Sequence, residues 1–185
     1  MKRVASTIRF LVLGDFLILK LKLALETIGE RVEIAKALDH EKKQKEIIII
    51  HHGKFNIILN PVNSTYVSLI MKIQITPEDG AKLAKQNPEF HNEFGFILNR
   101  ELLTGRSAFT LVHDENKKPV ELREIYLMQN IVVEDFDKNT KQQLSYAIQE
   151  LVNSGLRVGQ ILGTTFSSIK GSTSDGKHYD GPMYG

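Results

Sequence analysis

The chain of 185 residues contains no cysteine and no tryptophan. The lack of cysteine excludes disulfides, a thiolate nucleophile and cysteine-ligated zinc, and it favours a reducing compartment, so we expect a cytoplasmic protein. An excess of one charge is lacking too, since 24 lysines and arginines face 22 aspartates and glutamates, for a formal net charge of +2. This balance argues against nucleic acid as the main partner. Glycine-rich phosphate loops are also absent, and we expect no cofactor.

A long apolar run near the N-terminus imitates a signal peptide or a membrane span. Charges interrupt it at Asp15 and follow it closely at Lys20 and Lys22. Each such charge costs about 2.5–3.5 kcal/mol at the centre of a bilayer, whereas each leucine or isoleucine returns only about 0.3–0.6 kcal/mol. The residues after Leu23 also lack the small-x-small pattern of a cleavage site. We therefore predict neither export nor a membrane span.

Residues 1–23 are better interpreted as a folded N-terminal segment. The stretches 9–13 and 16–23 flank Gly14 and Asp15, which together are typical of a two-residue hairpin turn, and residues 19–23 alternate between leucine and lysine as a half-buried strand does. The alternative is a helix from Thr7 to Leu25, in which Gly14 would cost about 1 kcal/mol. Both interpretations stay open, and the hairpin is the one we favour.

Residues 24–165 are predicted to form a single domain in which helices and strands come in separate groups. Apolar residues at three- and four-residue spacing predict a helix over 24–44, and runs of β-branched residues predict three strands after it. Helix-capping signals at Thr76-Pro77 and Asn87-Pro88 predict two further helices. The expected strands are 46–52, 54–60, 65–75, 107–113 and 119–127, and the expected later helices are 77–86, 88–105 and 135–162. Glycine and serine dominate residues 166–185, for which we predict a disordered tail.

This order of elements differs from the strict strand–helix alternation of a doubly wound fold. It predicts an α+β fold in which an antiparallel sheet of about five strands carries its helices on one face.

The stretches 73–78, 90–98 and 125–126, followed by the terminal helix, resemble a family of uncharacterised archaeal proteins. That family is similar in layout to type III secretion chaperones. The resemblance covers roughly residues 45–163, implies a homodimer, and brings no assigned activity with it.

The side chains that could carry catalysis or bind a metal have simpler interpretations. His51 and His52 are neighbours on a predicted strand and so point to opposite faces, which prevents them from sharing one metal ion. His91 and His113 are single and isolated, and the acidic residues at 134, 135 and 137 fit the start of a helix. Gly155, Gly159 and Gly163 indicate a frayed helix end. We therefore expect no catalytic residue and no metal site.

The apolar N-terminal segment is the most informative feature for function. It either belongs to the core or forms an interface, because large apolar patches seldom stay exposed. The residues expected at such an interface are Phe10, Val12, Phe16, Leu19, Leu21 and Leu23. The function that follows is a non-enzymatic, homodimeric protein-binding or chaperone-like module whose partner is another polypeptide. The alternatives are a nucleic-acid accessory protein that uses the lysines of the first 45 residues, and an enzyme whose site the sequence does not reveal.

Overall fold

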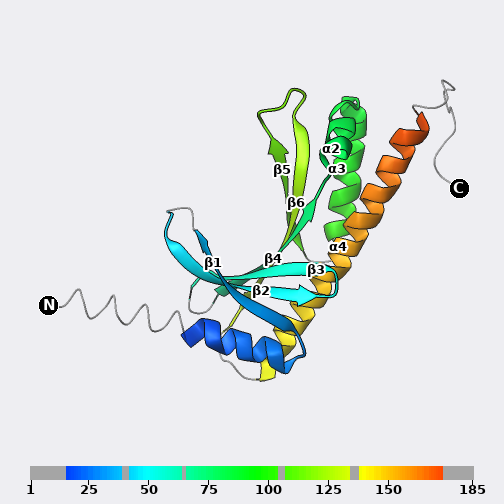
Figure 1. Cartoon of the computed structure of the whole chain (residues 1–185). Helices are drawn as coiled ribbons and strands as arrows, with labels where there is room; N and C mark the ends of the chain where they lie inside the picture. Colours follow the sequence, from blue (N-terminus) through cyan, green and yellow to red (C-terminus); the bar gives the residue numbers. More distant parts are fainter. Residues whose placement is uncertain (1–15, 39–41, 64–65, 104–106, 134–137, 173–185) are drawn as a thin grey trace, which may run out of the picture.

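Within the part of the chain that the structure describes, six antiparallel strands form one sheet, in the order β1-β2-β3-β4-β6-β5. The computed structural model describes residues 16–38, 42–63, 66–103, 107–133 and 138–172. The strands are β1 Arg31–Leu38, β2 Gln44–His52, β3 Phe55–Pro61, β4 Tyr66–Gln74, β5 Ala108–Asp114 and β6 Glu121–Val132. The helices are an N-terminal helix over 16–27, α2 Pro77–Ala84, α3 Pro88–Leu103 and α4 Lys138–Ser172. The fold is α+β, as the sequence predicts, with one strand more than expected (Figure 1).

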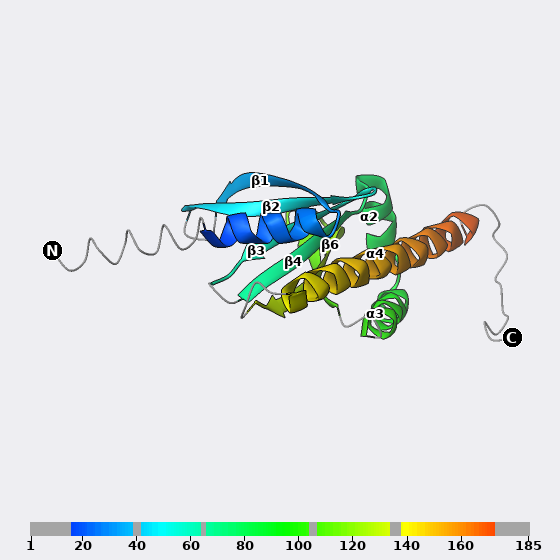
Figure 2. The ribbon, with the colours of Figure 1, turned by 90° about the horizontal axis from the view of Figure 1, so that it is seen from below.

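One face of the sheet supplies the core, because alternate residues of a strand point to opposite faces. On β2, Ile48 and Ile50 are fully buried, and they pair with the equally buried Leu59 and Ile57 of β3. The same parity continues into β4 and β6, where Met71 pairs with Leu127. The helices supply the opposite side of this core, and Figure 2 shows the N-terminal helix and α4 in front of the strands.

The two middle helices begin at the capping signals present in the sequence. The Thr76 hydroxyl oxygen accepts a hydrogen bond from the backbone N–H of Asp79 at 3.1 Å, and Pro77 occupies the first helical position of α2. Before α3, the Asn87 side-chain oxygen accepts from the N–H of Phe90 at 2.8 Å. These bonds satisfy N–H groups that the first turn of a helix leaves without partners. The predicted starts of both helices are confirmed.

The helix α4 lies against β4 and β6 and closes the core. Its buried side includes Leu144, Ile148 and Leu151, which follow helical spacing. Gly155 allows the close approach to β4, because a Cβ atom there would lie 2.7 Å from the Met71 Sδ atom. This glycine is therefore a packing position in a continuous helix and does not mark a frayed end.

The predictions for the N-terminal third are wrong in two places. Residues 16–23 form part of a helix, so the favoured hairpin is incorrect over the described residues and the alternative helix is the better prediction there. The helix predicted over 24–44 is correct only for residues 24–27, because the chain turns at Gly29, which has a φ of +92°, and continues as β1. Pairing along the whole of β1 with β2 outweighs the weak helical spacing of this stretch.

The end of the chain is more ordered than its composition suggests. The helix α4 continues to Ser172, so the disorder predicted for 166–185 is wrong over 166–172. Phe166 packs against the core and Ile169 is 5% exposed, so apolar contacts hold this last part of the helix. The many serines and glycines around these two residues make that contact hard to predict from the sequence. Residues 173–185 lie outside the described part of the chain.

Candidate protein-binding surfaces

The face of the sheet that points away from the helices carries a row of apolar side chains. Ile49 of β2 pairs with Ile58 of β3, Ile58 pairs with Ile70 of β4, and Ile70 pairs with Met128 of β6. These four residues, which we call the apolar row, cross four adjacent strands in one line. Each is half-buried by its neighbours on the strands, and none belongs to the core cluster on the helical side. The row is therefore a continuous apolar surface that none of the described helices covers.

Polar side chains border the apolar row on both sides. On one side the Ser68 hydroxyl donates to the Asn130 side-chain oxygen at 2.6 Å. On the other side the Lys72 ammonium forms an ion pair with Glu124, and the Tyr126 hydroxyl donates to the same carboxylate at 2.7 Å. The hydrogen bond from Lys72 lowers the pKa of Glu124, and the hydrogen bond to Glu124 raises the pKa of Tyr126. These groups hold one another in fixed positions beside the row.

A second exposed apolar surface lies on the N-terminal helix. Leu17, Ile18 and Leu21 are buried, because they lie on the side of this helix that faces the core. On its outer side Phe16 is 55% exposed, Leu19 is 58% exposed and Leu23 is 66% exposed. These three residues, spaced by three and four positions, form what we call the outer stripe. A helix that is apolar on two opposite sides has a second side available for a contact beyond its own core.

The structure divides the six residues predicted at an interface. Phe10 and Val12 lie outside the described residues. Leu21 is fully buried in the core of this chain, so its assignment to an interface is corrected: on a helix, unlike on a strand, it lies on a different side from Leu19 and Leu23. The other three are the outer stripe. The signal in the sequence is the spacing: Phe16, Leu19 and Leu23 follow one another at three and four residues, as on one side of a helix, and Leu21 does not fit that spacing.

The apolar row was missed because the sequence does not show which face of a sheet remains uncovered. The run of isoleucines from 47 to 50 gives no alternation, so both of its sides look equally suited to a core. Only the packing of the helices distinguishes Ile48 and Ile50 from Ile49.

No group of three potential metal ligands occurs in the described part of the chain. The Nδ1 atom of His51 lies 2.9 Å from the Asn56 side-chain oxygen, while that of His52 lies 2.9 Å from a Glu30 carboxylate oxygen, so the two rings have separate partners. His91 and His113, distant in sequence, line one small pocket between α2, α3, β5 and β6 whose walls are mainly apolar. The acidic residues at 134, 135 and 137 lie outside the described residues.

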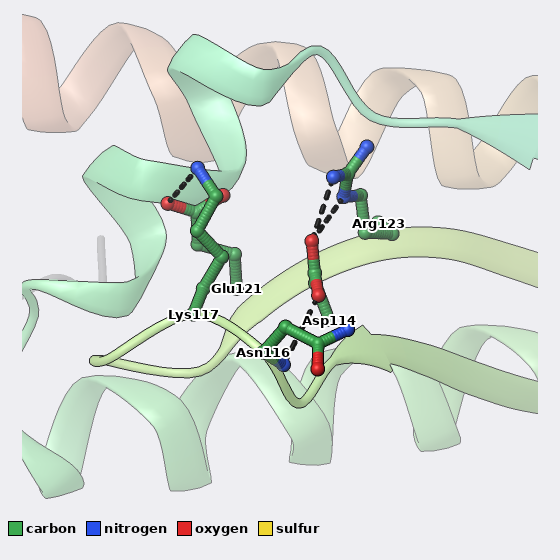
Figure 3. Close-up of polar contacts among 5 residues, drawn as sticks. All are labelled: Asp114, Asn116, Lys117, Glu121 and Arg123. Atoms are coloured by element: carbon green, nitrogen blue, oxygen red, sulfur yellow. Dashed lines mark hydrogen bonds and ion pairs between the residues drawn. The ribbon is translucent and has the colours of Figure 1, made fainter.

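A polar cluster holds the end of the β5–β6 hairpin (Figure 3). The Arg123 guanidinium donates two hydrogen bonds to one oxygen of Asp114, at 2.6 and 3.2 Å, and the backbone N–H of Asn116 donates to the other at 3.1 Å. The hydrogen bonds from Arg123 lower the pKa of Asp114. Beside them Lys117 reaches one oxygen of Glu121 at 3.5 Å. These contacts explain the cluster as a structural element of the hairpin.

The Asp114–Arg123 pair predicts a component of acid sensitivity. Because the folded state lowers the pKa of Asp114, this carboxylate stabilises the fold fully above its unfolded pKa of about 3.9, and the contribution disappears as the pH falls through the lower folded value. We expect Asp114→Asn to flatten the fall of the free energy of unfolding below about pH 4. Urea unfolding across a pH series measures this. In an Arg123→Met background the same substitution should have much less effect, and an equal effect in both backgrounds would contradict the pairing.

None of the described helices is both long enough and apolar enough to cross a bilayer.

No protein-family model matches the chain, and no curated protein matches it either. Among solved structures, an uncharacterised protein from Methanothermobacter thermautotrophicus is similar, with a TM-score of 0.59 and 18% identity over 79% of this chain and 96% of the other. YbjN from E. coli aligns with a TM-score of 0.42 and 9% identity, over 82% of this chain and 92% of the other.

The similarity to the Methanothermobacter structure shows a shared fold. It agrees with the archaeal resemblance noticed in the sequence and identifies no function. The candidate surfaces of this chain must therefore be interpreted from their own residues.

Proposed function

We propose that this protein is a non-enzymatic, chaperone-like module that binds an apolar segment of another polypeptide on the open face of its sheet. The observation that carries the proposal is the apolar row, in which Ile49, Ile58, Ile70 and Met128 are cross-strand neighbours. Burial of apolar surface is the main favourable contribution to most protein association. A row of β-branched and methionine side chains offers this contribution over a continuous surface that the described helices leave open.

The dimensions of the row suit a short segment of polypeptide. Its four strands are separated by three spacings of about 4.8 Å, so the row is about 14 Å long. That length matches about two and a half turns of a helix or about four residues of extended chain. The polar residues on both sides, Ser68 and Asn130 on one and Lys72 and Tyr126 on the other, provide hydrogen-bonding groups at the rim.

A direct test uses an unfolded protein as the probe. We expect the full chain to bind a permanently unfolded test protein, such as reduced and carboxymethylated lactalbumin, and we expect Ile58→Lys with Ile70→Lys to weaken that binding at least about tenfold. Fluorescence anisotropy of the labelled test protein measures the affinity. Thr110→Lys is the control for each single variant, Ile58→Lys and Ile70→Lys, since it adds one lysine to the same face of the sheet, on β5 and outside the row.

The outcomes separate the proposal from its alternatives. Unchanged affinity in the double variant, with thermal unfolding showing that it is folded, would refute the apolar row as the binding surface. Binding of a single-stranded oligonucleotide that disappears as salt rises, without binding of unfolded protein, would support the nucleic-acid alternative.

The homodimer implied by the sequence stays a prediction, and the edges of the sheet suggest where it would form. The edge strand β1 pairs with β2 without a bulge, whereas the other edge strand, β5, has an irregularity between Val112 and His113. Bulges are one means by which proteins protect an edge from pairing with another chain. The regular edge at β1 is therefore the one suited to strand addition by a second copy, and light scattering during gel filtration measures the resulting mass.

A further inference from the structure

The outer stripe of the N-terminal helix points almost directly away from the rest of the protein. With 3.6 residues per turn, the buried Leu21 and Leu25 lie on the side opposite to Phe16 and Leu23. The three stripe residues are each more than half exposed. The stripe is therefore on the helical layer of the molecule, and Figure 2 shows that the N-terminal helix lies over one face of the sheet. The register of the strands places the apolar row on the opposite face.

Two lysines border the outer stripe, one on each side. Lys20 and Lys22 occupy helical positions on either side of the line through Phe16, Leu19 and Leu23. The Lys20 ammonium lies over the Phe16 ring, 4.4 Å from its centroid, and Lys22 is paired with Glu26 at 3.7 Å. Long lysine side chains that follow apolar surface with their stems and place their ammonium groups at its border are typical of helices at a lipid–water interface.

The distribution of charge along the chain agrees with this pattern. The first 23 residues contain five basic residues and one acidic residue, a formal charge of +4. The remaining residues contain 19 basic and 21 acidic residues, a formal charge of −2, so the whole chain carries +2. The helix over 16–27 itself carries Lys20 and Lys22 against Glu26, a formal charge of +1, and the other three basic residues, at 2, 3 and 9, precede the described part of the chain. A basic N-terminal segment is attracted to a surface of anionic lipids.

We propose that the outer stripe binds the surface of an anionic lipid bilayer, with the N-terminal helix lying in the plane of the headgroups. Phe16, Leu19 and Leu23 enter the boundary between headgroups and acyl chains, and Lys20 and Lys22 contact lipid phosphates at either side. In this orientation the apolar row faces away from the membrane and remains accessible. The protein is then a peripheral module that presents its sheet to the surrounding solution.

A second copy of the chain is a less suitable occupant of the same surface. In a two-fold symmetric pair, each helix meets the same surface patch of the other. Lysines stand on both sides of the stripe, so Lys20 and Lys22 of one copy would come close to lysines of the other, in parallel and in antiparallel arrangements alike. Like charges in such contacts weaken association, whereas an anionic surface complements them.

The test uses the full-length protein and vesicles of two compositions. We expect binding to vesicles of phosphatidylcholine mixed with phosphatidylglycerol, and much weaker binding to phosphatidylcholine alone. Leu19→Glu with Leu23→Glu should reduce the partition coefficient at least about tenfold, and Lys20→Gln with Lys22→Gln should also reduce it about tenfold or more, because each lysine contributes about fivefold. Co-sedimentation measures the partition coefficient, and circular dichroism confirms that each variant is folded.

Phe96→Glu is the control for the single variant Leu23→Glu, because Phe96 is 65% exposed on α3, close to the 66% of Leu23, and lies outside the stripe. Its binding to the mixed vesicles should equal that of the unchanged protein. Absence of binding to both kinds of vesicle, or equal binding by the leucine variant, would overturn the proposal. If the leucine variant instead converts a dimer to a monomer while vesicles remain unbound, the stripe is a protein interface and the lipid proposal is wrong. The variants at Ile58 and Ile70 should still bind vesicles, which keeps this test independent of the proposed function.

Discussion

Gly80→Ala is expected to destabilise the protein by about 1–3 kcal/mol, although alanine is the better helix former. A Cβ atom at this position in α2 would lie 2.6 Å from the backbone carbonyl oxygen of Leu122 on β6. A carbonyl oxygen held in a sheet cannot move aside as the end of a flexible side chain can. The helix must therefore shift away from the strand or the strand must bend, and either change disturbs the packing of the buried Leu83.

Gly159→Ala is the matched control for this substitution. Gly159 lies in α4, is exposed, and has nothing within 4 Å of an added Cβ atom. At this position the difference in helix propensity alone sets the change in the free energy of unfolding, so alanine should stabilise the protein by about 0.8–1.0 kcal/mol. Urea unfolding of both variants, monitored by circular dichroism, gives the two free energies. The same sign for both substitutions would show that the contact between α2 and β6 is looser than the structure indicates.

Leu127→Ala is expected to have the largest effect of any single change considered, a loss of about 2–5 kcal/mol in the free energy of unfolding. Leu127 is fully buried on β6 and pairs with the buried Met71. Truncation removes apolar contacts and leaves a cavity that the surrounding sheet and helix can fill only in part. Its neighbour Met128 points to the opposite face and is half-buried, so Met128→Ala should cost less than about 1 kcal/mol.

Differential scanning calorimetry on the two alanine variants measures this difference between adjacent residues. A clear loss for Leu127→Ala beside a small loss for Met128→Ala would confirm which side of β6 faces the helices. Comparable losses would mean that the face with the apolar row is covered in solution. Such a result would also argue against the proposed binding surface, because a covered row could not hold a segment of another polypeptide.

The two candidate surfaces have a simple relation within this fold. The apolar row is on the open face of the sheet, and the outer stripe is on the helical layer, so one molecule can make both contacts at once. A charged substitution at Ile58 should therefore affect polypeptide binding alone, and one at Leu19 should affect vesicle binding alone. Additivity of such separate effects is expected for sites that share no partners.

Local signals in the sequence determined the middle of the chain. The capping residues Thr76 and Asn87 and the prolines after them predict the starts of α2 and α3, because a cap acts through hydrogen bonds within a few residues of itself. The β-branched runs likewise predict β2, β3 and β4 nearly to their ends. The predicted end of β6, at residue 127, was five residues too early, because residues 128–132 owe their strand conformation to pairing with β4.

By itself, then, the sequence determined the α+β class, the antiparallel meander and the capped helices, since each of these depends on neighbours along the chain. Only the tertiary structure decided that residues 31–38 are a strand, because β2 supplies their hydrogen bonds. The tertiary structure also placed Leu21 in the core and left Phe16, Leu19 and Leu23 outside. It separated Ile49 from Ile48 and Ile50 in the same way. Burial depends on which elements pack against a face, and those elements come from distant parts of the chain.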